Sequence, residues 1–187
     1  MELKELLAGV AVIFAILGNV PYLRDVIKGK VQPHPYTWLV WSIVSMVTFF
    51  GVLLKGGGLG AIPTGVSEFF TIVIFLFSLR YGFKNIARKD TYFLIIALLG
   101  LIPWVLTKDP TMSVVIVVGI DLVAFIPTLR KTWLYPDTER PILYGMNVLR
   151  HILTLFSLNS YNVATTVHSV AMIITNSLMV VFMKRKK

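Results

Sequence analysis

The stretch PYLR at residues 21–24 is followed after ten residues by Pro35, and the stretch PTLR at residues 127–130 is followed after ten residues by Pro141. The pattern P-x-L-R-x(10)-P therefore recurs at an offset of 106 residues, and each copy joins two long apolar runs. A repeat of this size in an apolar chain predicts a membrane protein built from two equivalent halves.

The composition is that of an integral membrane protein. Of the 187 residues, 56% are hydrophobic and 14% are charged, whereas a soluble domain carries about 25% charged residues. In such a chain a net charge of +9 reports topology in the lipid bilayer, and we expect no nucleic-acid partner. The sequence holds no cysteine, so disulfide and thiolate chemistry are excluded.

Seven apolar runs have the length of a membrane span, which is about 20 residues. We expect these helices at residues 5–25, 36–55, 60–81, 91–108, 111–131, 141–159 and 162–184. The first run lacks a basic flank and a small-residue cleavage site, so we interpret it as a retained helix and not as a signal peptide.

Lysine and arginine indicate the orientation of the chain. They are concentrated after the first, third and fifth runs and in the C-terminal tail: Arg24, Lys28, Lys30, Arg80, Lys84, Arg88, Lys89, Arg130, Lys131, Arg140, Lys184, Arg185, Lys186 and Lys187. The opposite connections carry only Lys4, Lys55 and Lys108. Since cytoplasmic connections carry the basic excess, we expect an outside N-terminus and a cytoplasmic C-terminus, in the plasma membrane.

The repeat explains the odd number of helices. Three helices end on the side opposite to their start, so a second copy in the same orientation requires one additional crossing. We therefore expect an all-α membrane protein of 3+1+3 helices: a three-helix bundle at 1–89, an inversion linker helix at 90–109 and a parallel three-helix bundle at 110–187.

This arrangement resembles the SWEET and PQ-loop transporter superfamily over nearly the whole chain. Tyr22 and Thr128 stand where PQ-loop members carry glutamine, so the chain resembles a divergent member. The resemblance implies transport of a small polar solute, such as a sugar, an amino acid or a vitamin, by alternating access without ATP. It also implies hinge roles for Pro21, Pro35, Pro127 and Pro141.

The physics of these prolines is independent of the resemblance. Pro21 and Pro127 lack the amide hydrogen that would bond the carbonyls of Leu17 and Val123, which permits a bend in each helix. The second proline of each copy sits where a helix begins, a position that tolerates proline well.

Polar residues within the expected spans are the candidates for a site, because polar groups at membrane depth require a partner or a function. Aromatic and polar residues share one face of 36–55 and one face of 141–159, a combination that suits a compact polar solute. The expected solute-binding residues are Trp38, Trp41, Asn147, Arg150, His151 and Asn176. The candidate proton sites are Glu68, Asp121 and His168. The repeat places Phe70 or Ile72 opposite Asn176, which argues against the paired asparagines of sugar-carrying SWEET proteins.

Two interpretations of Asp121 and Arg150 remain open. They lie at similar depth on successive helices, so they could form a structural salt bridge. Alternatively, Arg150 anchors a carboxylate or phosphate with its planar fork, and Asp121 exchanges protons.

Two other classes of function compete with a carrier. KDEL receptors share this architecture and recognise a peptide carboxylate with basic residues in the membrane, so a receptor is the alternative that Arg150 keeps open. An intramembrane protease is disfavoured, because residues 65–68 match the rhomboid serine motif only in part. We expect no enzymatic activity and no cofactor. Lysine within the spans and metal-ligand spacing are both lacking, which disfavours a retinal protein and a metal site.

Overall fold

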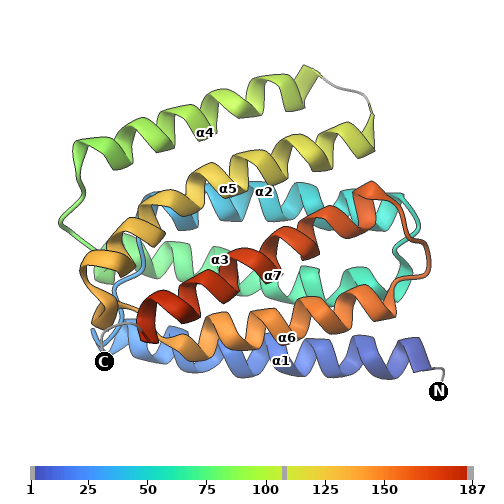
Figure 1. Ribbon diagram of the computed structural model, residues 1–187, viewed down its shortest axis with the longest axis horizontal. Helices are drawn as coiled ribbons and strands as arrows, with labels where there is room; N and C mark the ends of the chain where they lie inside the picture. Colours follow the sequence, from blue (N-terminus) through green and yellow to red (C-terminus); the bar gives the residue numbers. More distant parts are fainter. Residues whose placement is uncertain (1–2, 107–108, 185–187) are drawn as a thin grey trace.

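The computed structural model describes residues 3–106 and 109–184. Within these ranges the chain forms seven α-helices and two short 3-10 turns, and no strand. The helices are α1 (Leu3–Ile27), α2 (Pro35–Leu54), α3 (Ile62–Tyr81), α4 (Arg88–Leu106), α5 (Pro110–Leu134), α6 (Pro141–Ser157) and α7 (Val163–Lys184). All seven run roughly along the long axis of the molecule (Figure 1). The expected helical fold is therefore confirmed, with helix ends that differ by a few residues.

The prolines of the repeat occupy two kinds of position. Pro35 and Pro141 are the first residues of α2 and α6, as their fixed backbone angle favours. Pro21 and Pro127 lie inside α1 and α5, which continue through them as helices. The expected helix starts are confirmed, and the hinge role of the prolines stays a prediction.

Five helical segments are long and apolar enough to cross a membrane, with mean hydropathies from 1.7 to 2.3. They are Leu3–Ile27, Pro35–Leu54, Gly58–Tyr81, Thr111–Leu134 and Val163–Lys184. Over their described residues, α4 and α6 do not meet this criterion of length and hydropathy. With 17 residues, α6 is about 25 Å long, slightly less than the hydrocarbon thickness of a bilayer of about 30 Å. The five spans indicate a membrane protein.

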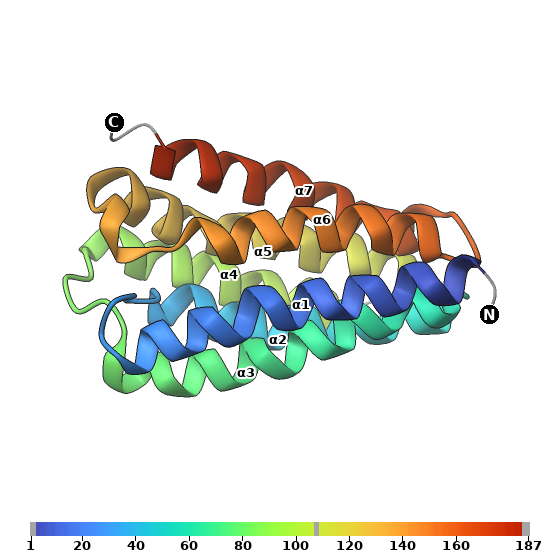
Figure 2. The same cartoon turned by 90° about the horizontal axis from the view of Figure 1, so that it is seen from below.

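The helices pack in an order that differs from their order in the chain. The third helix of each half is central: α3 packs against both α1 and α2, and α7 packs against both α5 and α6. The two halves meet where α1 packs against α6 and α2 packs against α5. Helix α4 packs along α5 at the edge of the molecule in Figure 1, and it lies behind the other helices in Figure 2.

Small residues allow the two halves to approach closely. The stripe of Ala8, Ala11, Ala15 and Gly18 on α1 is buried, and a side chain added at Gly18 would place its Cβ 3.0 Å from the Cβ of Met146 on α6. At the other junction, a Cβ at Gly51 of α2 would meet Val114 of α5 at 2.4 Å. Close backbone approach is a common means of helix association in membranes.

The connections α1–α2, α3–α4 and α5–α6 lie at the same end of the molecule, which is also the end where α7 finishes (Figure 1). The basic residues expected on one side of the membrane are thus gathered at one end, as far as the structure describes them. Lys108 and Arg185, Lys186 and Lys187 lie outside the described residues.

Candidate functional site

A polar cavity of about 60 Å³ lies between the two halves. Six helices contribute to its wall, and among the described residues α4 contributes none. The lining residues are Asn19, Trp38, Trp41, Ser45, Ser67, Thr71, Asp121, Leu143, Tyr144, Asn147, Arg150, His151, His168, Met172 and Asn176. Since one water occupies about 30 Å³ in the liquid, this conformation has room for a very compact solute or a few waters.

The wall of this cavity brings together all six residues expected to bind a solute, and two of the three candidate proton sites, Asp121 and His168. Glu68 is the exception, because it lines a separate groove between α2 and α3. Glu68 is buried, and it lies near Ser45 and Asp121 of the cavity wall.

Arg150 is a buried guanidinium without a counter-ion among the described residues. Its Nε donates to Oδ1 of Asn147 at 3.3 Å, and its Nη2 donates to Nε2 of His151 at 2.6 Å. Nη1 is buried and makes no hydrogen bond. Only 4% of the residue is exposed, so a positive charge with a free donor faces a site that excludes bulk water. Such a group favours an anionic ligand.

The contact with Arg150 also determines which ring nitrogen of His151 carries the hydrogen. A guanidinium has donors and no acceptor, so Nε2 of His151 must be the acceptor in their contact. Nδ1 then carries the ring hydrogen and donates it to Oγ of Ser169 at 3.2 Å. This pair of hydrogen bonds holds His151 as a neutral imidazole in one tautomer.

Of the two interpretations of Asp121 and Arg150, the salt bridge is not formed. Oδ2 of Asp121 lies 3.6 Å from Nε2 of His168 on α7 instead. The reason is the packing order, because α7 contacts both α5 and α6 and brings His168 to Asp121. The ring of His168 in turn contacts the ring of His151, with 5.4 Å between the ring centroids. A polar chain therefore crosses the cavity wall from the carboxylate of Asp121 to the guanidinium of Arg150.

The aromatic part of the wall offers two hydrogen-bond donors. Trp38 packs against Tyr22 with 5.5 Å between ring centroids, and Trp41 stacks on Phe125 at 5.0 Å. The indole nitrogens of Trp38 and Trp41 are buried and without a hydrogen bond in the described structure. The two rings thus contribute to the packing and also present donors at the cavity.

Several lining residues were missed by the sequence-based selection. Asn19 was not chosen, although an asparagine within an apolar run and two residues before Pro21 was a usable signal. Its Nδ2 donates to the carbonyl of Ala15 at 2.8 Å. Ser67 of α3 gave no such signal, because which face of α3 meets the cavity depends on packing.

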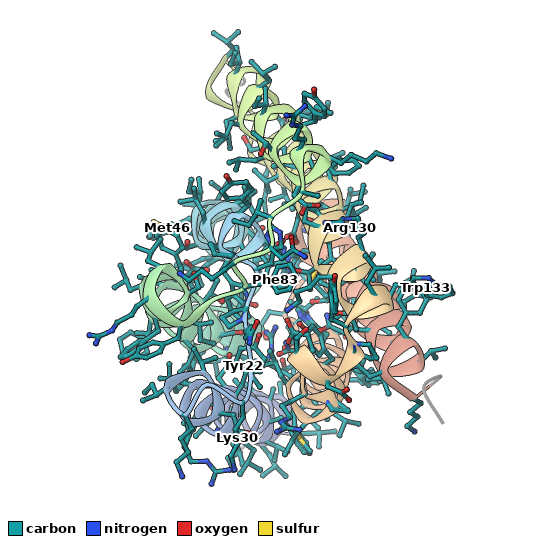
Figure 3. All side chains as sticks on the ribbon, turned by 90° about the vertical axis from the view of Figure 1, so that its left-hand side faces the viewer. Tyr22, Lys30, Met46, Phe83, Arg130 and Trp133 are labelled. Carbon is teal, nitrogen blue, oxygen red and sulfur yellow. The ribbon has the colours of Figure 1, made fainter. Side chains whose placement is uncertain are left out.

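A buried ion pair lies at the proline end of the molecule, where α1 and α5 finish and α2 and α6 begin. We call the residues Tyr22, Lys131 and Glu139 the clasp. Lys131 donates to Oε1 of Glu139 and, at 2.6 Å, to the carbonyl of Gln32, while the hydroxyl of Tyr22 donates to Oε2 of Glu139 at 2.9 Å. The side chains of Lys131 and Glu139 are fully buried. In Figure 3, Tyr22 points from α1 toward the centre of the molecule. The clasp therefore joins the first half of the chain to the second.

A second ionic cluster holds α4 at the same end. Asp90 accepts from Nε and Nη2 of Arg130 at 3.0 and 2.8 Å, from the backbone N–H of Ala87 at 2.9 Å, and lies 3.4 Å from Nε2 of His34. Burial opposes ionisation of Asp90, but the hydrogen bonds from Arg130 and Ala87 outweigh it and hold the pKa of this carboxyl below its usual value. Burial lowers the pKa of His34 from 6.5 to about 4, although Asp90 opposes that shift.

Acidification is expected to destabilise this end of the molecule. In an unfolded chain His34 becomes protonated below pH 6.5, its ordinary pKa. In the folded chain its imidazole stays neutral down to pH about 4. Stability is therefore lost as pH falls through this window, by at most about 3 kcal/mol. The unfolding temperature in detergent, measured between pH 7.5 and 4.5, should fall less steeply for His34→Gln than for the natural protein. Equal slopes would contradict this prediction.

No protein-family model, curated protein or solved structure matches the chain. The fold and the cavity define its class by themselves. The protein is a helical membrane protein in which six helices surround a polar cavity that holds an unpaired arginine.

Proposed function

We propose that the chain is a membrane carrier that moves a small polar solute with a carboxylate or phosphate group by alternating access. The proposed architecture is the 3+1+3 arrangement of SWEET and PQ-loop transporters, with an outside N-terminus and a cytoplasmic C-terminus. The two rocking units are residues 1–89 and 110–187, and residues 90–109 are the inversion linker.

The observation that carries this proposal is the unpaired guanidinium of Arg150. Its free Nη1 and buried position would be unfavourable without an anion. The neighbouring amide of Asn147 and the indole donors of Trp38 and Trp41 supply further polar contacts and ring faces. Together they suit a compact anion with a small apolar part.

The equivalent packing of the two halves supports alternating access. In each half the third helix packs against the first and the second, and each first helix packs against the second helix of the other half. The cavity lies at this junction. A rigid-body movement of one half against the other would therefore open the cavity to one side at a time.

The contact of Asp121 with His168 supports proton linkage. A carboxylate and an imidazole at 3.6 Å in the cavity wall can hold or release a proton when an anion binds beside them. Entry of the anion with a proton would reduce the charge that crosses the membrane.

A ligand screen followed by uptake tests the proposal. Protein in neutral detergent is heated with acetate, glycine, glutamate, inorganic phosphate or glucose, and an acidic compound is expected to raise the unfolding temperature while glucose does not. Proteoliposomes should then accumulate the active compound. Binding without uptake would favour a receptor, and failure of every acid to bind would overturn the proposed role of Arg150.

Straightening the two proline helices is expected to reduce uptake about tenfold while folding is preserved. Alanine at positions 21 and 127 restores the backbone hydrogen bonds to Leu17 and Val123 and so favours one access state. Uptake and unfolding temperature of Pro21→Ala/Pro127→Ala are compared with Pro63→Ala, which changes a proline in the first turn of α3 outside the repeat. Unchanged uptake in the double variant would rule out the hinge role.

A further inference from the structure

A second, apolar groove lies between α2 and α3, and its residue Glu68 lies near Ser45 and Asp121, which line the central cavity. Its volume is about 430 Å³. The apolar lining consists of Met46, Phe49, Phe50, Ile62, Gly65 and Val66. Met46 stands at the periphery of the molecule on α2 (Figure 3), and it is 44% exposed. The groove therefore opens toward the surface that the membrane covers.

Glu68 is the only charged residue that lines this groove, within the part of the chain that the structure describes. It is 6% exposed, and both of its carboxylate oxygens are buried without a hydrogen bond. No lysine, arginine or histidine of the described residues forms an ion pair with it. A buried carboxylate in apolar surroundings is unfavourable unless a positive charge accompanies it.

The shape of the groove depends on a glycine. A Cβ at Gly65 would lie 2.9 Å from Cε2 of Phe49, so the lack of a side chain lets this ring lie close to α3. The rings of Phe49 and Phe50 meet edge to face at 5.1 Å between centroids. Aromatic faces beside an anionic group attract organic cations through the ring quadrupole.

The chemistry of the lining selects among cations. A metal ion requires several oxygen ligands, and the groove provides one carboxylate amid carbon. An anion would be repelled by Glu68. An organic ammonium ion with an apolar body satisfies the carboxylate and fills the apolar volume together. We propose that this groove binds a lipophilic ammonium cation that enters from the bilayer, with Glu68 as its counter-ion.

Benzyltrimethylammonium is a suitable probe, because its charge does not depend on pH. Its neutral counterpart is neopentylbenzene, in which carbon replaces the quaternary nitrogen. We expect radiolabelled benzyltrimethylammonium to bind the purified full chain in neutral detergent, and neopentylbenzene not to displace it. Glu68→Gln should weaken this binding at least tenfold, since it removes the charge at constant size.

Two more variants keep the experiment decisive. Met46→Trp fills the groove from an exposed position and should weaken binding while the protein folds normally, so it replaces Glu68→Gln if that variant does not fold. Asp121→Asn removes the carboxylate of the central cavity, which lies near Glu68, and should weaken cation binding much less than Glu68→Gln does.

Three results would overturn the proposal. The first is displacement of the cation by neopentylbenzene at equal concentration, because the groove would then be an apolar surface that lipid chains fill. The second is binding of the cation by both Glu68→Gln and Met46→Trp as tightly as by the natural protein. The third is loss of binding in Asp121→Asn, which would place the cation in the central cavity.

Discussion

Arg150→Met is expected to weaken binding of the acidic solute by about 100-fold or more, while the ligand-free protein unfolds at the same temperature or higher. The expected loss follows from removal of the charged partner of a buried anion, which is worth about 2–5 kcal/mol. Stability is preserved because the natural guanidinium is buried without a counter-ion, and an apolar side chain of similar length removes that unfavourable charge. The measurements are the thermal shift and the proteoliposome uptake of the compound identified in the screen.

Two variants make this result specific. Arg150→Lys keeps the charge but loses the planar fork and the contacts to Asn147 and His151, so we expect intermediate affinity. Arg24→Met removes an exposed arginine, whose side chain is 63% exposed, and should bind the solute normally. If Arg150→Met instead lowers stability and leaves the affinity of the remaining folded protein unchanged, Arg150 is a structural residue.

Glu139→Ala is expected to be the most destabilising single substitution in the protein, at about 3–5 kcal/mol. The ammonium of Lys131 would remain fully buried with the carbonyl of Gln32 as its acceptor, and the hydroxyl of Tyr22 would lose Glu139. Unfolding in detergent, followed by heating or by denaturant, provides the measurement.

The second half of this test is a double-mutant cycle. Lys131→Met/Glu139→Leu removes both charges and should recover a substantial part of the loss, since an apolar pair replaces a buried ion pair at little cost. The cycle is completed by Lys131→Met and Glu139→Leu as single variants, and additive effects of these two would argue against direct coupling. Because the clasp joins the two halves at the proline end, its removal should also favour the conformation that opens there.

Local patterns in the sequence were sufficient for the helices and for most of the cavity. Runs of about 20 apolar residues predict helices wherever they occur, and prolines 35 and 141 predicted where α2 and α6 begin. Polar and aromatic residues that could bind a solute are rare inside such runs. Choosing them from the sequence therefore identified Trp38, Asn147 and Arg150, which line one cavity. These properties depend on residues a few positions apart, so they are readable from the chain.

The partners of the charged residues were decided by tertiary packing. One interpretation paired Asp121 with Arg150 on the next helix, but α7 packs against both α5 and α6 and supplies His168. Lys131 was interpreted only as a topological charge, yet it is buried against Glu139. Glu68 lines the α2–α3 groove.

The sequence by itself thus determined which segments are helices, where the repeat places its prolines and which helices carry polar residues within their apolar runs. The tertiary structure alone decided which of those polar residues meet. The physical reason is that burial of a helix face follows from its own periodicity, whereas contact between two faces depends on the order in which the helices pack. In this chain the third helix of each half packs against the first and the second, and that order gave Asp121 its neighbour His168.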